Sequence, residues 1–208
     1  NRSYPLCKML EENNLDRCNI DRRIHISPPK SSTRFPITDV YLTESESKEV
    51  TFDNYLNYAI DLTVSILKKH SSGHILLFLP GAQDITAAVL AINKLTSERI
   101  IAVPYYRGVT DYTMELVTNL LNRLPLLTQS KEDALHLDYK SEQDVRAGTR
   151  EQCVIVATNI AGASVTFPGV TIVIDSGIAK TNTYDPMSGK EMMRKLLISK
   201  SSSQQRRG

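Results

Sequence analysis

The stretch that decides the fold covers residues 153–177 and reads CVIVATNIAGASVTFPGVTIVIDSG. It contains two short apolar runs, residues 153–157 and 170–174, and polar residues follow each of them. Runs that are apolar on both faces are typical of the buried strands of a parallel sheet. The stretch therefore predicts two successive buried strands, and a polar turn follows the first of them.

Two more strands and two helices are expected before this stretch. Residues 74–79 (HILLFL) are apolar after His74, residues 100–103 (IIAV) are apolar throughout, and Pro80-Gly81 ends the first run. Apolar residues recur at helical spacing in residues 55–67 and 85–95. Strands that alternate with helices predict an α/β fold, a doubly wound parallel sheet flanked by helices.

The length of 208 residues and the hydrophobic content of 41% suit one α/β domain with a short appendage. We expect residues 1–22 to be a lead-in segment and residues 23–208 to form the domain. Residues 113–152 are weakly patterned, and we interpret them as a variable surface insertion that carries a helix over 114–121.

The three cysteines, Cys7, Cys18 and Cys153, form no CxxC pair, and Cys153 opens an apolar run. This pattern favours free thiols in a reducing compartment. No apolar run reaches the length of a membrane span, and the first residues lack the apolar core of a signal peptide. The sequence therefore predicts a cytoplasmic or nuclear protein with no membrane partner.

The net charge of +2 is unevenly distributed. Residues 178–208 contain seven Lys or Arg against two acids, a net +5, which leaves −3 for the rest of the chain. A basic end on a near-neutral body can form a contact surface for an anionic polymer. The alternative is an ordinary solvated charged face.

Several catalytic patterns are absent from the sequence. It contains no P-loop, no dinucleotide-binding glycine fingerprint, and no His, Cys or Asp cluster with metal-ligand spacing. We therefore expect no catalytic residue and no metal site within the chain.

Three polar segments are candidate binding turns. Two of them follow predicted strands, and the third lies at the end of the basic C-terminal segment. Residues 80–83 (PGAQ) combine a strand end, a glycine that lets another backbone approach, and a helix N-terminus whose amides suit a phosphate. Residues 157–166 (ATNIAGASVT) place short hydroxyl and amide side chains after a buried strand, where they suit sugar and phosphate oxygens. Residues 205–208 (QRRG) offer guanidinium groups. The alternatives are an ordinary strand-to-helix turn and a plain basic tail.

These turns, in this order, resemble the second RecA-like domain of DEAH-box ATP-dependent RNA helicases (DEAH/RHA type, superfamily 2). The stretch ILLFLPGAQDI (residues 75–85) resembles motif IV. Residues 154–177 resemble motif V and its following strand, and SKSSSQQRRG resembles the approach to motif VI. The resemblance covers residues 23–208, and it implies that the sequence is truncated within motif VI.

The resemblance also predicts a β-hairpin over residues 178–198, between motifs V and VI. In this family the hairpin helps to part the strands of a duplex. Its turn would be residues 185–189 (DPMSG), which are common turn residues. A purely structural hairpin is the alternative.

The resemblance implies a function shared between two lobes. ATP and Mg would be held mainly by a first RecA-like lobe, and this second lobe would bind RNA and close over the nucleotide, with protein partners as a further possibility. RNA-facing residues would be Gly81, Gln83, Thr158, Asn159, Lys180, Lys190, Arg194 and Lys195. Nucleotide-facing residues would be Ser164, Thr166, Gln205 and Arg206.

The sequence departs from the family pattern in three places. Gly162 and Ala163 stand where motif V carries Glu and Thr, and Pro168 stands where an Asp would contact the ribose. Residues 113–138 contain no aromatic side chain to stack on adenine. The alternative function is therefore a catalytically degenerate scaffold that binds RNA or a protein without hydrolysing ATP.

Overall fold

The structure is a computed structural model that describes residues 36–109, 117, 151–162, 165, 167–187 and 189–207. The chain divides into two compact units, residues 1–43 and 44–208. The described part of the first unit, residues 36–43, has no regular secondary structure. The predicted lead-in segment and most of the predicted insertion lie outside the described residues, although Val117 is helical and buried.

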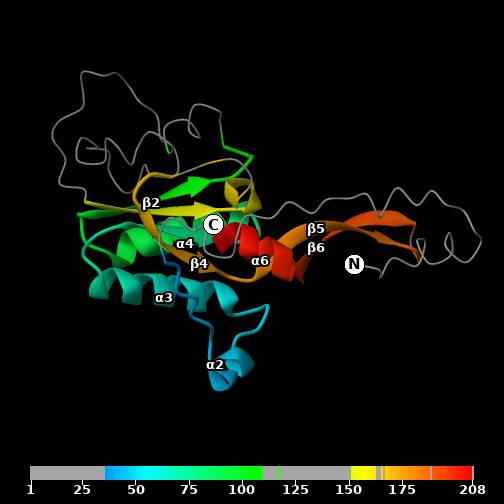
Figure 1. Cartoon of the computed structure of the whole chain (residues 1–208). Helices are drawn as coiled ribbons and strands as arrows, with labels where there is room; N and C mark the ends of the chain where they lie inside the picture. The colour runs from blue at the N-terminus through cyan, green and yellow to red at the C-terminus, as the bar shows by residue number, and fades with distance from the viewer. Residues whose placement is uncertain are drawn as a thin grey trace, which may run out of the picture. The chain divides into compact units, whose positions relative to one another are not determined.

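The second unit contains helices and strands in alternation (Figure 1). In chain order these are α2 (Glu44–Glu49), α3 (Tyr55–Lys69), β1 (His74–Phe78), α4 (Ala82–Leu95), β2 (Ile100–Tyr105), β3 (Gln152–Ala157), the 3-10 helix η3 (Asn159–Gly162), β4 (Val170–Asp175), β5 (Ile178–Asp185), β6 (Lys190–Leu197) and α6 (Lys200–Arg207).

The main sheet has four strands in the order β2-β3-β1-β4, and every pair is parallel. The central strands are β3 and β1, and almost all of their side chains are buried. Leu77 pairs with Val156 on one side and with Ile174 on the other. The predicted doubly wound α/β sheet is therefore confirmed, because the apolar runs occupy the positions that are covered on both faces.

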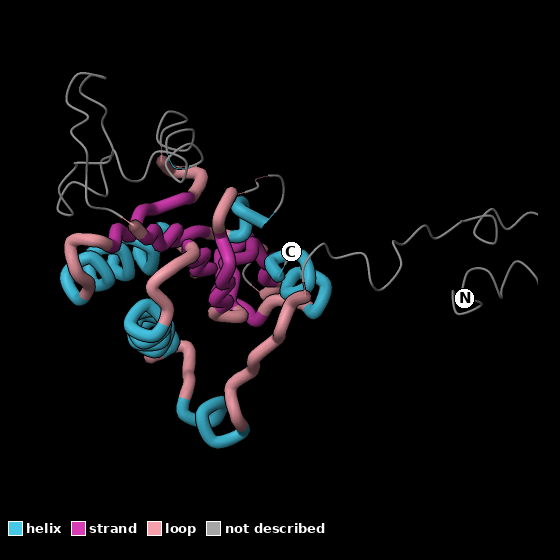
Figure 2. The backbone as a smooth tube through the Cα atoms, turned by 60° about the vertical axis from the view of Figure 1, so that its left-hand side comes forward, coloured by secondary structure: helices cyan, strands magenta, loops and turns pink. Residues whose placement is uncertain are grey.

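Helices cover the sheet through the apolar faces that the sequence spacing predicts. The buried positions of α4 include Ile85, Val89 and Ile92, which pack onto β2 and β3. Helix α3 packs against α4. Figure 2 shows α3 and α4 on one side of the strands and α6 on the other.

Two helices form where no helix is expected. Helix α2 lies in the acidic segment before α3 and has no buried residue. Helix α6 lies in the basic end, and its N-terminus is capped because the Ser202 amide donates to the Ser199 hydroxyl at 3.1 Å. Strand β2 also runs two residues further than expected, through Pro104, which an edge position in the described sheet tolerates.

The predicted β-hairpin is confirmed by strands β5 and β6, which pair in antiparallel register from Ile178 opposite Leu197 to Asp185 opposite Lys190. The turn is closed because the Gly189 amide donates to the Asp185 carbonyl at 2.8 Å. Gly189 has a φ of +66°, a conformation that favours glycine. Figure 1 shows the hairpin projecting from the sheet as an arm.

Candidate nucleic-acid and nucleotide interface

Three turns lie side by side at the carboxyl-terminal edge of the sheet: the predicted polar turns after β1 and β3, and the Ser176-Gly177 turn after β4. The third predicted turn, residues 205–208, lies instead at the end of helix α6, which extends to Arg207. The three turns at the edge follow β1, β3 and β4, which are adjacent parallel strands. Backbone bonds join the turns, since the Leu79 amide donates to the Ala157 carbonyl at 2.8 Å and the Ser176 amide donates to the Phe78 carbonyl at 3.2 Å. This edge is where open α/β sheets bind ligands.

The turn after β1 contains the predicted RNA-facing residues Gly81 and Gln83. Gln83 is exposed in the first turn of α4, whereas Gly81 is buried and caps this helix. A Cβ atom at Gly81 would lie 2.8 Å from the Nζ atom of Lys180. Sequence reasoning expects another backbone to approach this glycine, but the atoms that approach it belong to a lysine side chain.

The turn after β3 contains Thr158 and Asn159. The Thr158 side chain is half-buried, and Asn159 is exposed at the start of η3. The Thr158 amide donates to the Tyr105 carbonyl at the end of β2, at 3.2 Å. The structure thus brings both residues to the same edge as Gln83, whereas Ser164 and Thr166 lie outside the described residues.

Helix α6 docks onto this edge through Arg206. The Arg206 side chain is only 4% exposed and donates to Asp175 at the end of β4, at 2.7 Å. Its guanidinium also lies over the Phe78 ring, 5.0 Å from the centroid. The guanidinium predicted to face a nucleotide phosphate is therefore engaged within the domain, whereas its neighbour Gln205 is exposed.

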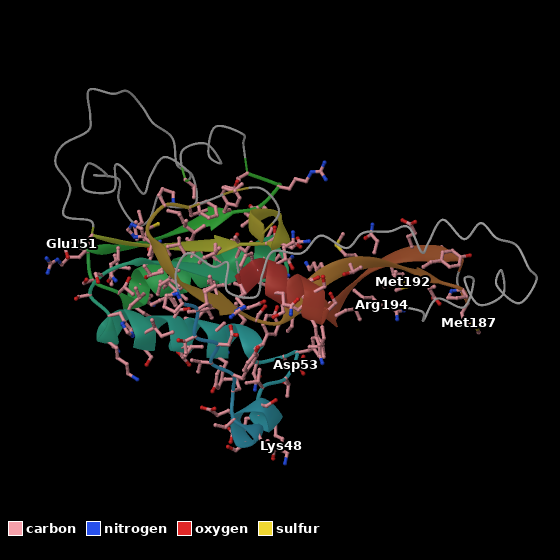
Figure 3. The ribbon with its side chains drawn as sticks, in the orientation of Figure 1. Lys48, Asp53, Glu151, Met187, Met192 and Arg194 are labelled. Carbon is pink, nitrogen blue, oxygen red and sulfur yellow. The ribbon has the colours of Figure 1, made fainter. Side chains whose placement is uncertain are left out.

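The hairpin carries two of the predicted RNA-facing cations in the open. Lys190 and Arg194 are both exposed on β6. Figure 3 shows Arg194 and Met192 along the projecting arm and Met187 at its tip. Met187 is 96% exposed, so the tip is accessible to a partner.

Lys195 and Lys180 differ from these two residues because they turn toward the body of the domain. The Lys195 ammonium donates to the Tyr55 hydroxyl at 2.8 Å and to the Asp84 carboxylate at 3.1 Å. It also lies over the Tyr55 ring, 5.0 Å from the centroid. Lys180 packs against Gly81, as described above. The charge of Lys195 is therefore paired within the domain, and its contact with RNA stays a prediction.

The pKa values of this cluster follow from its burial and its charges. Burial alone would lower the pKa of Lys195, but its bonds to Tyr55 and Asp84 outweigh burial and raise it. Burial is the main reason that the pKa of Tyr55 is raised, and the Lys195 bond only partly opposes it. The lysine is therefore charged and the tyrosine neutral around pH 7.

Sequence reasoning missed the acidic partners of these cations. Asp84 is only 8% exposed although it belongs to the mainly apolar buried face of α4, and Asp175 ends a mainly apolar strand. An acid at an apolar position is a recognisable signal, because such a group requires a partner. The sequence alone does not show which cation pairs with each acid, because Lys195 and Arg206 are both distant from their partners along the chain.

The described residues have two further properties that bear on the class of site. Each of their helices is too short or too polar to span a lipid bilayer. Within the same ranges, His, Cys, Asp and Glu side chains do not gather into a group of three that could hold a metal ion.

No model of a known protein family matches the chain. The chain is 40% identical, over all of its residues, to the mimivirus protein R366 (Acanthamoeba polyphaga mimivirus), which is named as an ATP-dependent RNA helicase, and covers 12% of it. It is 30% identical over 84% of its length to the pre-mRNA-splicing factor ATP-dependent RNA helicase DEAH10 of Arabidopsis thaliana, and covers 21% of it.

Solved structures show the same fold. The DExH-box NTPase HrpB of Escherichia coli aligns with a TM-score of 0.54 at 22% identity, over 76% of this chain and 16% of HrpB. The chain therefore spans between about an eighth and a fifth of the length of the proteins it matches. Its sequence is homologous to a segment of DEAH-box ATP-dependent RNA helicases.

Proposed function

We propose that this chain is the second RecA-like lobe of an ATP-dependent RNA helicase, which binds RNA and closes over ATP held by a first lobe. The observation that carries the proposal is the row of three turns at one edge of the sheet, next to a hairpin with exposed cations. Relatives named as ATP-dependent RNA helicases support it.

The RNA would contact the turns through short polar groups and the hairpin through charge. Gln83 and Asn159 are exposed, and the Thr158 hydroxyl is half-buried at the same edge, so they suit sugar and phosphate oxygens. Lys190 and Arg194 are free to approach phosphates along the arm. Phosphate contacts of this kind bind a polynucleotide without reading its sequence.

The nucleotide would meet this lobe through motifs V and VI. We assign this role to Ser164, Thr166 and Gln205, whereas Arg206 would hold α6 in place through Asp175. In phosphoryl transfer the protein positions the phosphates and neutralises the charge that develops on them. ATP and its Mg ion would be held mainly by the first lobe, so this lobe alone should bind ATP weakly.

We further propose that the parent protein works in the cytoplasm or the nucleus, where both RNA and ATP are present. The free, buried thiol of Cys153 is compatible with such reducing compartments. RNA and the first lobe would be the main partners, and protein partners are also expected.

Binding of fluorescently labelled single-stranded RNA, measured by anisotropy at several salt concentrations, tests the RNA-binding role. We expect the double variant Lys190→Glu/Arg194→Glu to weaken binding equally for unrelated RNA sequences. Each lost phosphate contact should lower the slope of log K against log salt by about 0.7 for a single strand.

Lys48→Glu is the matched control because Lys48 is an exposed cation on α2. Figure 3 shows it away from the hairpin. Lys195 is left unchanged because its charge is bonded to Asp84. Undetectable binding by the unaltered chain, or an equal loss in the Lys48→Glu control, would contradict the assignment.

The second candidate is a catalytically degenerate scaffold, favoured by Gly162, Ala163 and Pro168 in motif V. The helicase proposal expects a GK[ST] sequence in the first lobe of the parent protein and ATP hydrolysis that RNA stimulates. A parent protein that binds RNA but lacks the P-loop lysine and ATPase activity would establish the scaffold instead.

A further inference from the structure

Two lysines at the base of the hairpin point to one helix end. Lys180 on β5 and Lys195 on β6 are direct cross-strand partners, so their side chains leave the hairpin from the same face. Lys195 reaches Asp84, in the first turn of α4, and Lys180 packs on Gly81, which caps that helix. Both strands of the hairpin are thereby attached to the first helical turn of α4.

The attachment includes α3 as well as α4. Tyr55, the first residue of α3, is 4% exposed and accepts a hydrogen bond from Lys195. The Lys195 side chain is 35% exposed and the Asp84 side chain 11%, so the ion pair is only partly screened by water. Ion pairs of this kind hold two elements in a fixed orientation more effectively than fully exposed pairs do.

We propose that Lys180, Lys195, Gly81, Asp84 and Tyr55 form a hairpin latch, which fixes the direction of the projecting arm relative to the N-terminal end of α4. Lys180 and Lys195 are then positioning residues, not RNA contacts. The hairpin moves as one body with the turn that contains Gln83. The functional meaning of this coupling rests on the proposed RNA-binding role, whereas the latch itself does not.

Asp84 carries the strongest indication that the cluster is built for this purpose. Among the described residues, the acid lies in a helix face that packs on the core, and its Oδ1 atom accepts a hydrogen bond from Lys195. Its other carboxylate oxygen is buried without a partner among those residues. An ion placed there requires its cation, so the arm is held where Lys195 can reach it.

The opposite face of the hairpin provides a matched control. Arg194 is next to Lys195 in the sequence and carries the same charge, but it leaves the strand from the other face and pairs across the ladder with Thr181. It is exposed, and the bond recorded for it is a weak one to the Met192 sulfur at 3.7 Å. Lys195→Met and Arg194→Met therefore remove the same charge, but only the first removes the latch.

Hydrogen exchange of the 208-residue chain, measured by mass spectrometry without RNA, tests the latch directly. At the hairpin base, the Ile198 amide donates to the Gly177 carbonyl. We expect this amide and its neighbours at the base to exchange about three- to tenfold faster in Lys195→Met. Asp84→Asn should act in the same direction, and the double variant should add little to Lys195→Met. Exchange in β1 and β3 should be unchanged.

A distance measurement reports orientation independently of stability. Spin labels at Met187→Cys on the hairpin tip and Lys94→Cys on α4, with Cys7 and Cys18 replaced by Ser, should give a narrow distance distribution by pulsed electron paramagnetic resonance. We expect Lys195→Met to broaden this distribution and Arg194→Met to leave it unchanged.

Three outcomes would overturn the latch. These are equal exchange rates in Lys195→Met and the unaltered chain, equal effects of Lys195→Met and Arg194→Met, and faster exchange spread evenly over β1 and β3. Because RNA is absent from both experiments, failure of the latch is distinguishable from failure of the proposed function, which depends on RNA binding by the chain.

Discussion

Removing Asp175 should destabilise the domain more than removing its partner Arg206. The Arg206 side chain is 4% exposed and the Asp175 side chain 21%. Asp175→Ala leaves a buried guanidinium without an acid, and its Nε atom already lacks a partner among the described residues. Such a loss costs about 3 to 5 kcal/mol of the free energy of unfolding.

Arg206→Met should cost less, about 1 to 2 kcal/mol, because it removes the buried charge and keeps an unbranched side chain over Phe78. Asp175 remains satisfied in this variant, since it is partly exposed and also accepts from the Gly177 amide at 2.9 Å. The double variant Asp175→Ala/Arg206→Met should be close to Arg206→Met alone, a non-additivity of about 3 to 5 kcal/mol, equal to the cost of Asp175→Ala.

Urea unfolding of the four proteins, followed by circular dichroism, provides these free energies. Domains of this kind have a total stability of about 5 to 15 kcal/mol, so the expected differences are measurable. The reasoning fails if Arg206→Met is as destabilising as Asp175→Ala. It also fails if the two single effects simply add in the double variant.

Three further predictions concern buried polar groups. The Nδ1 atom of His74 accepts a hydrogen bond from the Cys153 amide, and burial lowers the pKa of His74 below 6.5. The free energy of unfolding should therefore fall as pH drops below about 6.5 toward the pKa of His74 in the folded protein. In urea titrations, this loss of stability should disappear in His74→Gln and remain in the control variant His70→Gln. The Asn93 side chain makes two hydrogen bonds with the backbone of Ala102, at 2.7 and 3.0 Å. Asn93→Leu should therefore lower the free energy of unfolding by about 2 to 4 kcal/mol in the same assay. A decrease below about 0.5 kcal/mol would contradict this account. Burial raises the pKa of the Cys153 thiol, so mass spectrometry should find this cysteine unmodified by iodoacetamide until urea unfolds the chain, and modification at the rate of a free thiol peptide would show that the site is open.

The sheet could be predicted because its strands are marked by composition alone. The runs at 75–79 and 153–157 are apolar throughout, a pattern typical of strands that are buried on both faces in a parallel sheet. The hairpin was predicted from family resemblance, and the structure confirms it. Helix α6 was missed because its residues are almost all polar, and Arg206 attaches it to Asp175, which lies 31 residues away.

The site was only partly predictable, for a similar reason. A position at the end of a strand is a local property, so Gln83, Thr158 and Asn159 are found at one edge as expected. The internal use of Lys195 depends on Asp84, 111 residues away, and a lysine in a basic segment looks the same whether it faces solvent or an acid. Ser164 and Thr166 stay predictions.

The short connections of the hairpin restrict how its length can change. Only Ser176 and Gly177 separate β5 from β4, and only Ile198 and Ser199 separate β6 from α6. A one-residue insertion in either connection that shifts the register of that strand by one position would turn every one of its side chains to the other face, and Lys180 or Lys195 would then point away from α4. Residue pairs added beside the 186–189 turn leave the base untouched, so related proteins and engineered variants can lengthen or shorten the arm at its tip while keeping the same direction of projection.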